Sequence, residues 1–310
     1  MKIIIDILKG AVMGIANVIP GVSGGTMAVA MGIYDRLINA LTHIFKEFKK
    51  SVLTVLPIGI GMVLGIVGLS MIIEKMFEVV PIQTNLLFMG LILGGVPAIW
   101  ARVKGKKVNG GHYFGFIVFF ALVIALSFVQ AGTEKQKEEM KAAESVETEA
   151  EAFSVETGVV PSIKYIGAGV IASGTMVVPG VSGSMMMMVM GMYEKIIGAI
   201  SNVVKALSAG DFETVGVCCG LLIPFAIGAV VGIFVIAKLI EILLAKFPVI
   251  TFWCILGLII GSPIAIVVVN SAIFAAISVV SILTGIVAFA VGFAIAFFLG
   301  KDPEKKAAKA

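Results

Sequence analysis

GAVMGIANVIPGVSGGTMAVAMGIYDRLINA (residues 10–40) aligns without gaps with GVIASGTMVVPGVSGSMMMMVMGMYEKIIGA (169–199), and 13 of the 31 positions are identical. Farther along the chain the similarity resumes after a shift of eight residues. There Pro57, Gly61, Gly65, Glu74, Pro81, Gly90 and Gly94 correspond in order to Pro224, Gly228, Gly232, Glu241, Pro248, Gly257 and Gly261. An ordered series with one small insertion indicates an internal duplication, so the chain consists of two related halves.

The composition predicts that both halves lie in a membrane. Of the 310 residues, 59% are hydrophobic and only 14% are charged, and the mean hydropathy is +1.12. Soluble domains carry about 25% charged residues. Six apolar stretches approach or exceed the roughly 20 residues that cross a hydrocarbon core, namely 52–73, 82–101, 112–130, 215–240, 249–268 and 272–299. We therefore expect an all-α integral membrane protein.

Two further apolar stretches, 3–40 and 163–205, are interrupted midway by the related motifs PGVSGG (20–25) and PGVSGS (179–184). Proline cannot donate to the helical hydrogen-bond ladder, and glycine admits non-helical backbone. Each stretch is therefore predicted to form a helix, a break and a second helix, which is the pattern of a re-entrant hairpin.

Lysine and arginine predict the orientation of the spans. The basic segments 43–50 and 101–110 and the basic tail 301–310 should face the cytoplasm. The acidic segment 131–161, with eight Glu and three Lys between residues 134 and 156, should lie outside as a surface helix or a solvated linker. Both chain termini are then cytoplasmic.

This assignment gives each half one re-entrant hairpin and three spans. Three is an odd number, so the second half would be inverted relative to the first, as in many secondary transporters. The expected division of the chain is a first repeat (1–130), an extracytoplasmic linker (131–161), a second repeat (162–300) and a cytoplasmic tail (301–310).

The two interrupted loops are the predicted substrate site. Non-helical backbone at membrane depth persists only when it is buried in protein or lines a wet cavity. A helix starts after each break, and helix N-termini attract anions such as phosphate. The predicted phosphate-binding residues are Ser23, Gly24, Gly25 and Thr26, then Ser182, Gly183 and Ser184, with the cations Arg36 and Lys195 and the amide of Asn17.

Each of these residues also has a simpler structural interpretation. A Pro-Gly break can be a helix kink whose serine satisfies the backbone. Asn17 can cap backbone instead of binding a ligand. Arg36 and Lys195 can be interfacial side chains paired with their acidic neighbours Asp35 and Glu194.

Glu74 and Glu241 are equivalent and are candidates for coupling to H⁺ or Na⁺, although a position at headgroup level explains both more simply. The cysteines, Cys218, Cys219 and Cys254, have no metal-ligand spacing, so no metal or cofactor is expected. The basic residues lie in short loops, which argues against a nucleic-acid partner. The sequence makes no prediction about the oligomeric state.

The segments GxANxIPGVSGGT (Gly14 to Thr26) and GIYDRLI (Gly32 to Ile38), together with PGVSGS, resemble the bacterial polyprenyl-phosphate transporter family. The resemblance covers nearly the whole chain except the acidic segment and the tail. It implies a flippase, not an enzyme, that returns undecaprenyl phosphate, the lipid carrier of peptidoglycan precursors, across the bacterial cytoplasmic membrane. The implied binding residues are Pro20–Thr26 and Pro179–Ser184, with Arg36 and Lys195.

The second loop departs from the first, because Ser184 and Met185 replace Gly25 and Thr26. Equal contact of the two loops with the ligand is therefore not expected.

Two alternatives remain open at this point. The first is a transporter of a small soluble anion, which would need a closed tunnel and not a groove open to the lipid. The second is an intramembrane serine hydrolase, because GVSG resembles a nucleophile loop. A nucleophilic serine needs a base, and the histidines are His43 and His112, both predicted at cytoplasmic boundaries.

Overall fold

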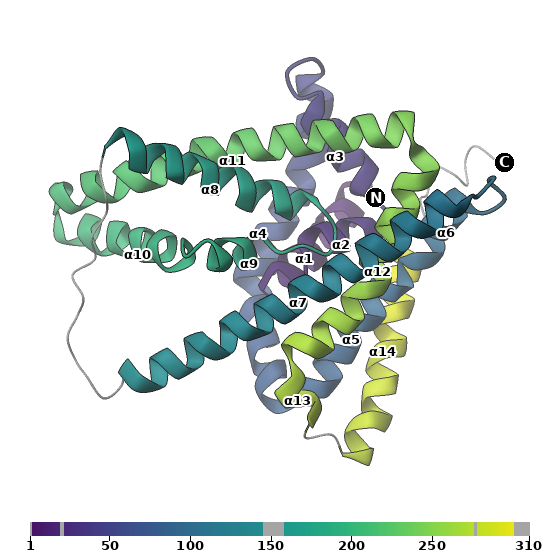
Figure 1. Ribbon diagram of the computed structural model, residues 1–310. Helices are drawn as coiled ribbons and strands as arrows, with labels where there is room; N and C mark the ends of the chain where they lie inside the picture. Colours follow the sequence, from purple (N-terminus) through teal and green to yellow (C-terminus); the bar gives the residue numbers. More distant parts are fainter. Residues whose placement is uncertain (1, 19–21, 145–157, 276–277, 301–310) are drawn as a thin grey trace. The chain divides into compact units, whose positions relative to one another are not determined.

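The computed structural model describes residues 2–18, 22–144, 158–275 and 278–300, and all regular structure in these ranges is α-helical (Figure 1). The predicted fold class is thus confirmed at the level of an all-α protein. The helices are α1 (Lys2–Val18), α2 (Gly24–Ala30), α3 (Tyr34–Thr42), α4 (Phe48–Val79), α5 (Pro81–Gly94), α6 (Val96–Val103), α7 (Gly110–Glu144), α8 (Val159–Val177), α9 (Gly183–Val189), α10 (Tyr193–Ala209), α11 (Phe212–Lys246), α12 (Pro248–Val269), α13 (Ser271–Ala275) and α14 (Val279–Leu299).

Six segments of the described chain are long and apolar enough to cross a membrane, and they overlap the six predicted stretches. They are Phe48–Gly68, Pro81–Val103, Gly110–Thr133, Phe212–Lys246, Pro248–Val269 and Val279–Leu299. The last predicted stretch, 272–299, differs in detail because α13 ends at Ala275 and α14 begins at Val279.

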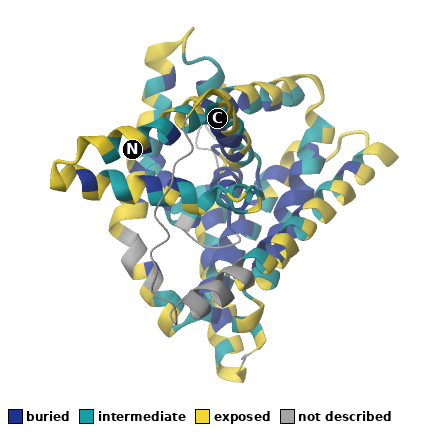
Figure 2. Cartoon of the chain, turned by 60° about the vertical axis from the view of Figure 1, so that its left-hand side comes forward, coloured by how far each residue is buried: buried dark blue, intermediate teal, exposed yellow. Residues whose placement is uncertain are grey.

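Burial differs among these spans in the way expected of a protein in lipid. The most apolar part of α12 is 61% buried, whereas those of α11 and α14 are only 17% buried. Figure 2 shows exposed residues along many helix surfaces and buried residues where helices meet. Large apolar side chains on an exposed surface are costly in water but fit a lipid environment. The protein is therefore a multi-pass membrane protein.

The acidic segment begins as a continuation of a membrane helix. The helix α7 runs from Gly110 to Glu144 without interruption, so its last 14 residues belong to the predicted linker 131–161. Residues 145–157 lie outside the described residues. Of the two expectations for this segment, helix is observed as far as Glu144.

The chain forms two compact units that do not follow the sequence repeats. Unit 1 comprises Met1–Phe128, Val178–Val181 and Ala237–Ala310, and unit 2 comprises Val129–Val177 and Ser182–Ile236. The helices α7 and α11 each contribute to both units. The division at the acidic linker into two repeats stays a prediction.

In unit 1, α1 and α4 cross with their backbones in contact. A Cβ atom added to Gly10 on α1 would lie 2.1 Å from a carbonyl oxygen of α4, and one added to Gly14 would lie 2.2 Å from another. In the same way, a Cβ atom added to Gly61 or Gly65 on α4 would lie 2.0 Å or 2.3 Å, respectively, from a carbonyl oxygen of α1. Only glycine permits this approach, which is a common way for membrane helices to associate.

Unit 2 repeats this crossing between α8 and α11, which run side by side in Figure 1. A Cβ atom on Gly169, Gly228 or Gly232 would lie 2.2, 2.0 or 2.3 Å from a carbonyl oxygen of the facing helix. These positions are the repeat equivalents of Gly10, Gly61 and Gly65. The core of unit 2 consists of Tyr165, Ile196, Ala199, Cys218 and Leu221.

The last span of each half packs against a helix from the other half within unit 1. Gly90 on α5 faces the carbonyl oxygen of Phe289 on α14, 2.1 Å from an added Cβ. Its equivalent, Gly257 on α12, faces the carbonyl oxygen of Phe116 on α7 at 2.3 Å. The duplicated halves have therefore exchanged their third spans.

Candidate functional site

Both motif regions contain the predicted order of helix, break and helix. In the first, α1 ends at Val18 and α2 begins at Gly24, while Pro20 and Gly21 lie outside the described residues. In the second, α8 ends at Val177 and α9 begins at Gly183. The motif serines, Ser23 and Ser182, both occupy the N-cap position in extended backbone. Their φ and ψ angles are −110° and 137° for Ser23 and −98° and 127° for Ser182.

Each motif is followed by a second break that the sequence analysis missed. Gly32 ends α2 with φ of +68°, and Gly191 ends α9 with φ of +64°. The N–H of Gly32 donates to Val29 O (3.0 Å) and that of Ile33 to Ala28 O (3.0 Å), and Gly191 and Met192 make the equivalent bonds. This is the glycine-dependent Schellman ending of a helix. It turns α10 by 109° from α9, and the repeated Met-Gly pair was the available signal.

In the first loop Asn17 makes the backbone-capping contact that was one of the two roles considered for it. Its Oδ1 accepts a hydrogen bond from the N–H of Gly24 at 3.1 Å, so Asn17 caps the start of α2 from the preceding helix. A Cβ atom on Gly24 would lie 2.6 Å from that oxygen. The amide and the glycine are therefore fitted to each other, and ligand binding by Asn17 stays a prediction.

Thr26 joins the first motif to the second. Its hydroxyl oxygen accepts a hydrogen bond from the N–H of Gly180 at 2.7 Å, and its side chain is fully buried. Gly180 has φ of +81° and packs against Val123 and Leu258. All four residues belong to unit 1. The Pro-Gly turn of the second motif thus lies against α2 of the first.

Ser23 is the unusual residue of the first loop. Its residue is only 6% exposed, and its Oγ has no hydrogen-bond partner among the described residues. Leaving a buried hydroxyl unpaired costs about 1–3 kcal/mol, and such groups in native proteins call for an explanation. In the second loop the Oγ atoms of Ser182 and Ser184 lie 2.8 Å apart and satisfy each other. The serines of the two loops therefore differ in their hydrogen bonding.

Arg36 lies on α3 and faces α1. Its Nη2 is 2.8 Å from Oδ1 of the buried Asp6, while the neighbouring Asp35 pairs with Arg102 at 3.0 Å. The expectation that Arg36 pairs with Asp35 is thus wrong, because α3 turns the two side chains toward different helices. The cavity that Arg36 lines contains none of the predicted loop residues. Lys195, on α10, is partly buried in unit 2.

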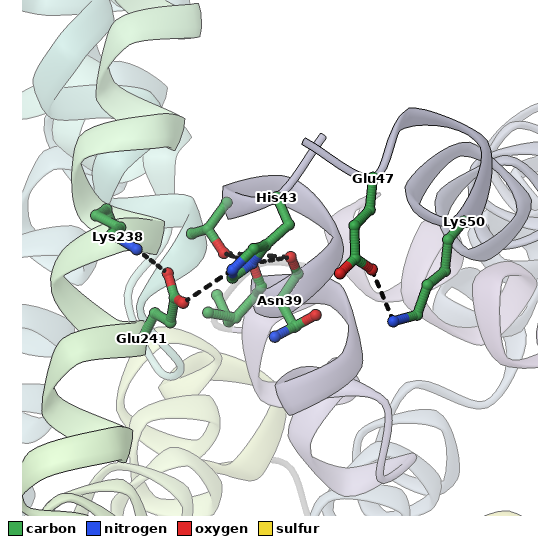
Figure 3. Close-up of polar contacts among 8 residues, drawn as sticks. Asn39, His43, Glu47, Lys50, Lys238 and Glu241 are labelled. Carbon is green, nitrogen blue, oxygen red and sulfur yellow. Dashed lines mark hydrogen bonds and ion pairs between the residues drawn. The ribbon is translucent and has the colours of Figure 1, made fainter. Parts of the chain in front are cut away.

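Glu241, one of the two coupling candidates, lies in a polar cluster of unit 1 (Figure 3). Its Oε2 is 2.7 Å from Nζ of Lys238, and its Oε1 is 3.7 Å from Nε2 of His43. Its equivalent Glu74 lies on α4, and its side chain is outside the described residues.

The histidines have described partners that account for them without catalysis. His43 contacts Glu241, and Nδ1 of His112 lies 2.6 Å from Oδ1 of Asn109. Neither ring has a described contact with Ser23 or Ser182. A nucleophilic serine needs a base within hydrogen-bond reach, so the geometry gives the serine hydrolase alternative no support.

Comparison with known proteins places the chain in a family. Residues 13–282 match the family model described as undecaprenyl phosphate translocase-like. A polyprenyl-phosphate transporter of Staphylococcus aureus is 32% identical over 302 residues, covering 96% of each chain. A second, from Vibrio cholerae, is 25% identical over 271 residues, covering 82% of this chain and 74% of its own. No solved structure matches the chain.

The match spans both glycine-rich motifs and five of the six apolar spans in full. The Staphylococcus relative extends the similarity over nearly the whole length of both proteins. The chain therefore belongs to the undecaprenyl phosphate translocase-like family.

Proposed function

We propose that this protein returns a polyprenyl phosphate, the lipid carrier of cell-envelope precursors, from the outer to the cytoplasmic leaflet of the bacterial cytoplasmic membrane. Membership of the translocase-like family and the names of both relatives support this function. A phosphate monoester carries about −1.5 to −2 charges at pH 7. Its passage through the membrane therefore needs hydrogen-bond donors inside the protein, while the prenyl chain can stay in lipid.

The observation that carries the proposed site is the buried hydroxyl of Ser23, which has no hydrogen-bond partner among the described residues. The residues around it are fixed, because Asn17 caps Gly24 and Thr26 binds the second motif at Gly180. A donor held ready at such a place can bond a phosphate oxygen, and this bond offsets part of the cost of removing the anion from water. Ser182 and Ser184 would contribute to a lesser degree, because they already bond each other.

The two halves are proposed to lie in the membrane in opposite orientations, with both termini cytoplasmic. The positions of Lys and Arg along the chain support this arrangement. In this mechanism the first hairpin enters from the cytoplasm and the second from outside, and a rearrangement of the two halves releases the phosphate to the cytoplasmic side.

The proposed activity is tested by reconstituting the purified protein in liposomes. We expect transbilayer movement of undecaprenyl phosphate to exceed that in protein-free liposomes, and no release of trapped inorganic phosphate. Release of inorganic phosphate without lipid movement would instead identify a transporter of a soluble anion. A comparison with and without gradients of H⁺ or Na⁺ reports the coupling ion in the same assay.

The orientation is tested with single cysteines in a protein from which Cys218, Cys219 and Cys254 have been removed. Lys46→Cys places a thiol in the exposed turn after α3, and Ser208→Cys places one in the exposed last turn of α10. In intact cells an impermeant maleimide should label Ser208→Cys only, and both should react after the membrane is opened. Labelling of both from outside, or of neither, contradicts the inverted arrangement.

A further inference from the structure

A cavity of about 430 Å³ lies in unit 1, away from the glycine-rich loops. Residues from α1, α3 and the first two turns of α4 line it, among them Ile3, Asp6, Arg36, Lys49, Lys50 and Leu53. The two lysines are exposed, so the cavity is accessible from the surface. By the charge distribution, this surface is the predicted cytoplasmic end of the first half.

Arg36 lines the cavity, and its side chain is 31% exposed. Its Nη2 lies close enough to Asp6 for an ion pair (2.8 Å), but the N–H bonds are not directed at the carboxylate. Neither Nη2 nor Nε, both buried, has a hydrogen bond within the described part of the chain. A guanidinium binds phosphate best through two parallel N–H bonds. Arg36 is thus held in place by Asp6 without being saturated by it.

The start of α4 adds positive charge in an unfavourable arrangement. Lys49 and Lys50 lie in its first turn, which contains no acidic residue, although cations at a helix N-terminus are disfavoured by the helix dipole. Lys50 is paired with the exposed Glu47 at 2.7 Å, and exposed pairs of this kind contribute little. An anion in the cavity would relieve this repulsion and take up the N-terminal field of the helix.

The second half has no such cationic cluster at the corresponding place. There α11 starts at Phe212 with Glu213 in its first turn, and Asp211 accepts a hydrogen bond from the N–H of Thr214 at 3.1 Å. This helix start is already provided with acidic groups. The cluster of cations at the start of α4 is therefore not repeated at the start of α11, unlike the duplicated motifs.

We propose that this cavity is a second binding station for a phosphate monoester that bears an apolar chain, distinct from the loops and placed at the cytoplasmic end. This inference rests on the proposed function, which supplies the polyprenyl phosphate. With the Glu47 that pairs with Lys50 included, three cations against two carboxylates leave an excess of one positive charge, which attracts a phosphate monoester. Ile3 and Leu53 on the rim are 61% and 63% exposed and can contact the adjoining chain. Asp6 competes with the phosphate for Arg36 and so favours its release.

The test uses farnesyl phosphate with a photoreactive diazirine at the end of its chain and the full protein in detergent. Crosslinking at Leu53 or Thr54, located by fragmentation of the tryptic peptide that contains them, reports occupancy of the cavity separately from the loops. In Lys49→Gln/Lys50→Gln the concentration for half-maximal labelling should rise about fivefold. The matched control Lys106→Gln/Lys107→Gln removes two exposed lysines from the other predicted cytoplasmic loop and should not change it.

The Asp6→Asn variant distinguishes competition of Asp6 with the ligand from a purely structural role of Asp6. The two roles predict changes in labelling of opposite sign. Removing the competing carboxylate should tighten labelling about threefold, whereas structural damage would weaken it. Weaker labelling in Asp6→Asn, or equal labelling in the lysine variant and its control, overturns the proposal. Inorganic phosphate and phosphatidylglycerol serve as competitors. If inorganic phosphate competes as well as unlabelled farnesyl phosphate does, the cavity is a site for free phosphate. If phosphatidylglycerol competes as well, the cavity is a site for anionic lipids in general.

The liposome assay keeps this inference separate from the proposed function. Lipid movement by the wild-type protein without labelling of the cavity would refute the second station alone. Labelling of the cavity without lipid movement would refute the flippase function and leave a prenyl phosphate-binding site.

Discussion

Replacing Ser23 with alanine should slow undecaprenyl phosphate movement at least tenfold and yet leave the protein as stable as before, or more stable by about 1 kcal/mol. The buried hydroxyl has no partner among the described residues, so its removal relieves a desolvation cost of about 1–3 kcal/mol. If phosphate is its missing partner, the same change removes a charge-assisted hydrogen bond, which contributes about 1.5–3 kcal/mol. Stability is measured by thermal unfolding in detergent and movement by the liposome assay.

The matched control is Ser182→Ala, at the equivalent position of the second motif. There the hydroxyl already pairs with Ser184 at 2.8 Å, so alanine leaves Ser184 without this partner. We expect a loss of stability of about 0.5–1.5 kcal/mol and a smaller effect on movement than for Ser23→Ala. If Ser23→Ala destabilises the protein and moves the lipid at the wild-type rate, the hydroxyl is structural and the proposed site is wrong.

The duplication could be read from the sequence because it leaves paired prolines and glycines that the structure uses in the same way in both halves. Pro81 and Pro248, for example, both begin a helix. The hydroxyl groups of Thr84 and Thr251 each lie within hydrogen-bond distance of the backbone carbonyl oxygens four and eight residues earlier in the chain. Local geometry of this kind depends on residues close in sequence, so a repeated sequence predicts repeated structure.

The exchange of third spans could not be read in the same way. Gly90 faces Phe289 across 199 positions of the chain, and Gly257 faces Phe116 across 141. Periodicity marks these glycines as small contact residues but carries no information on which helix they contact. Long-range pairing among helices of similar composition is fixed by shape, which a single sequence does not display.

The sequence indicated which residues belong to the candidate site, but it indicated only some of the contacts that these residues make. The serines, the glycines and Thr26 follow from the motif, and Thr26 does bind the second motif. The sequence offered backbone capping as one role of Asn17 but did not indicate Gly24 as the partner. It also did not indicate that Arg36 pairs with Asp6 across α1 and α3. Both contacts depend on the angle at which helices return after a break, and this angle is not encoded in the motif itself.

Replacing Gly61 with alanine should disrupt the crossing of α1 and α4, whereas the same replacement two residues earlier, at Gly59, should be harmless. A Cβ atom on Gly61 would lie 2.0 Å from the carbonyl oxygen of Ile7, and one on Gly59 would have no atom within 4 Å. Backbone cannot yield as a flexible side chain can, so Gly61→Ala must separate the helices at a cost of about 3 kcal/mol. Gly59→Ala should gain about 0.5–1 kcal/mol from its higher helix propensity.

The readout is the apparent Tm in detergent, which should fall by roughly 5–10 °C for Gly61→Ala and stay level or rise slightly for Gly59→Ala. Lipid movement should fall only in Gly61→Ala, because α1 carries Asn17, which caps the first loop. The second half offers an independent repetition with Gly228→Ala and Gly216→Ala on α11. A Cβ atom on Gly228 would lie 2.0 Å from the carbonyl oxygen of Ile166, whereas one on Gly216 would have no atom within 4 Å. Equal Tm values within each pair would mean that the close crossings, and with them the placement of the first loop, are not those described.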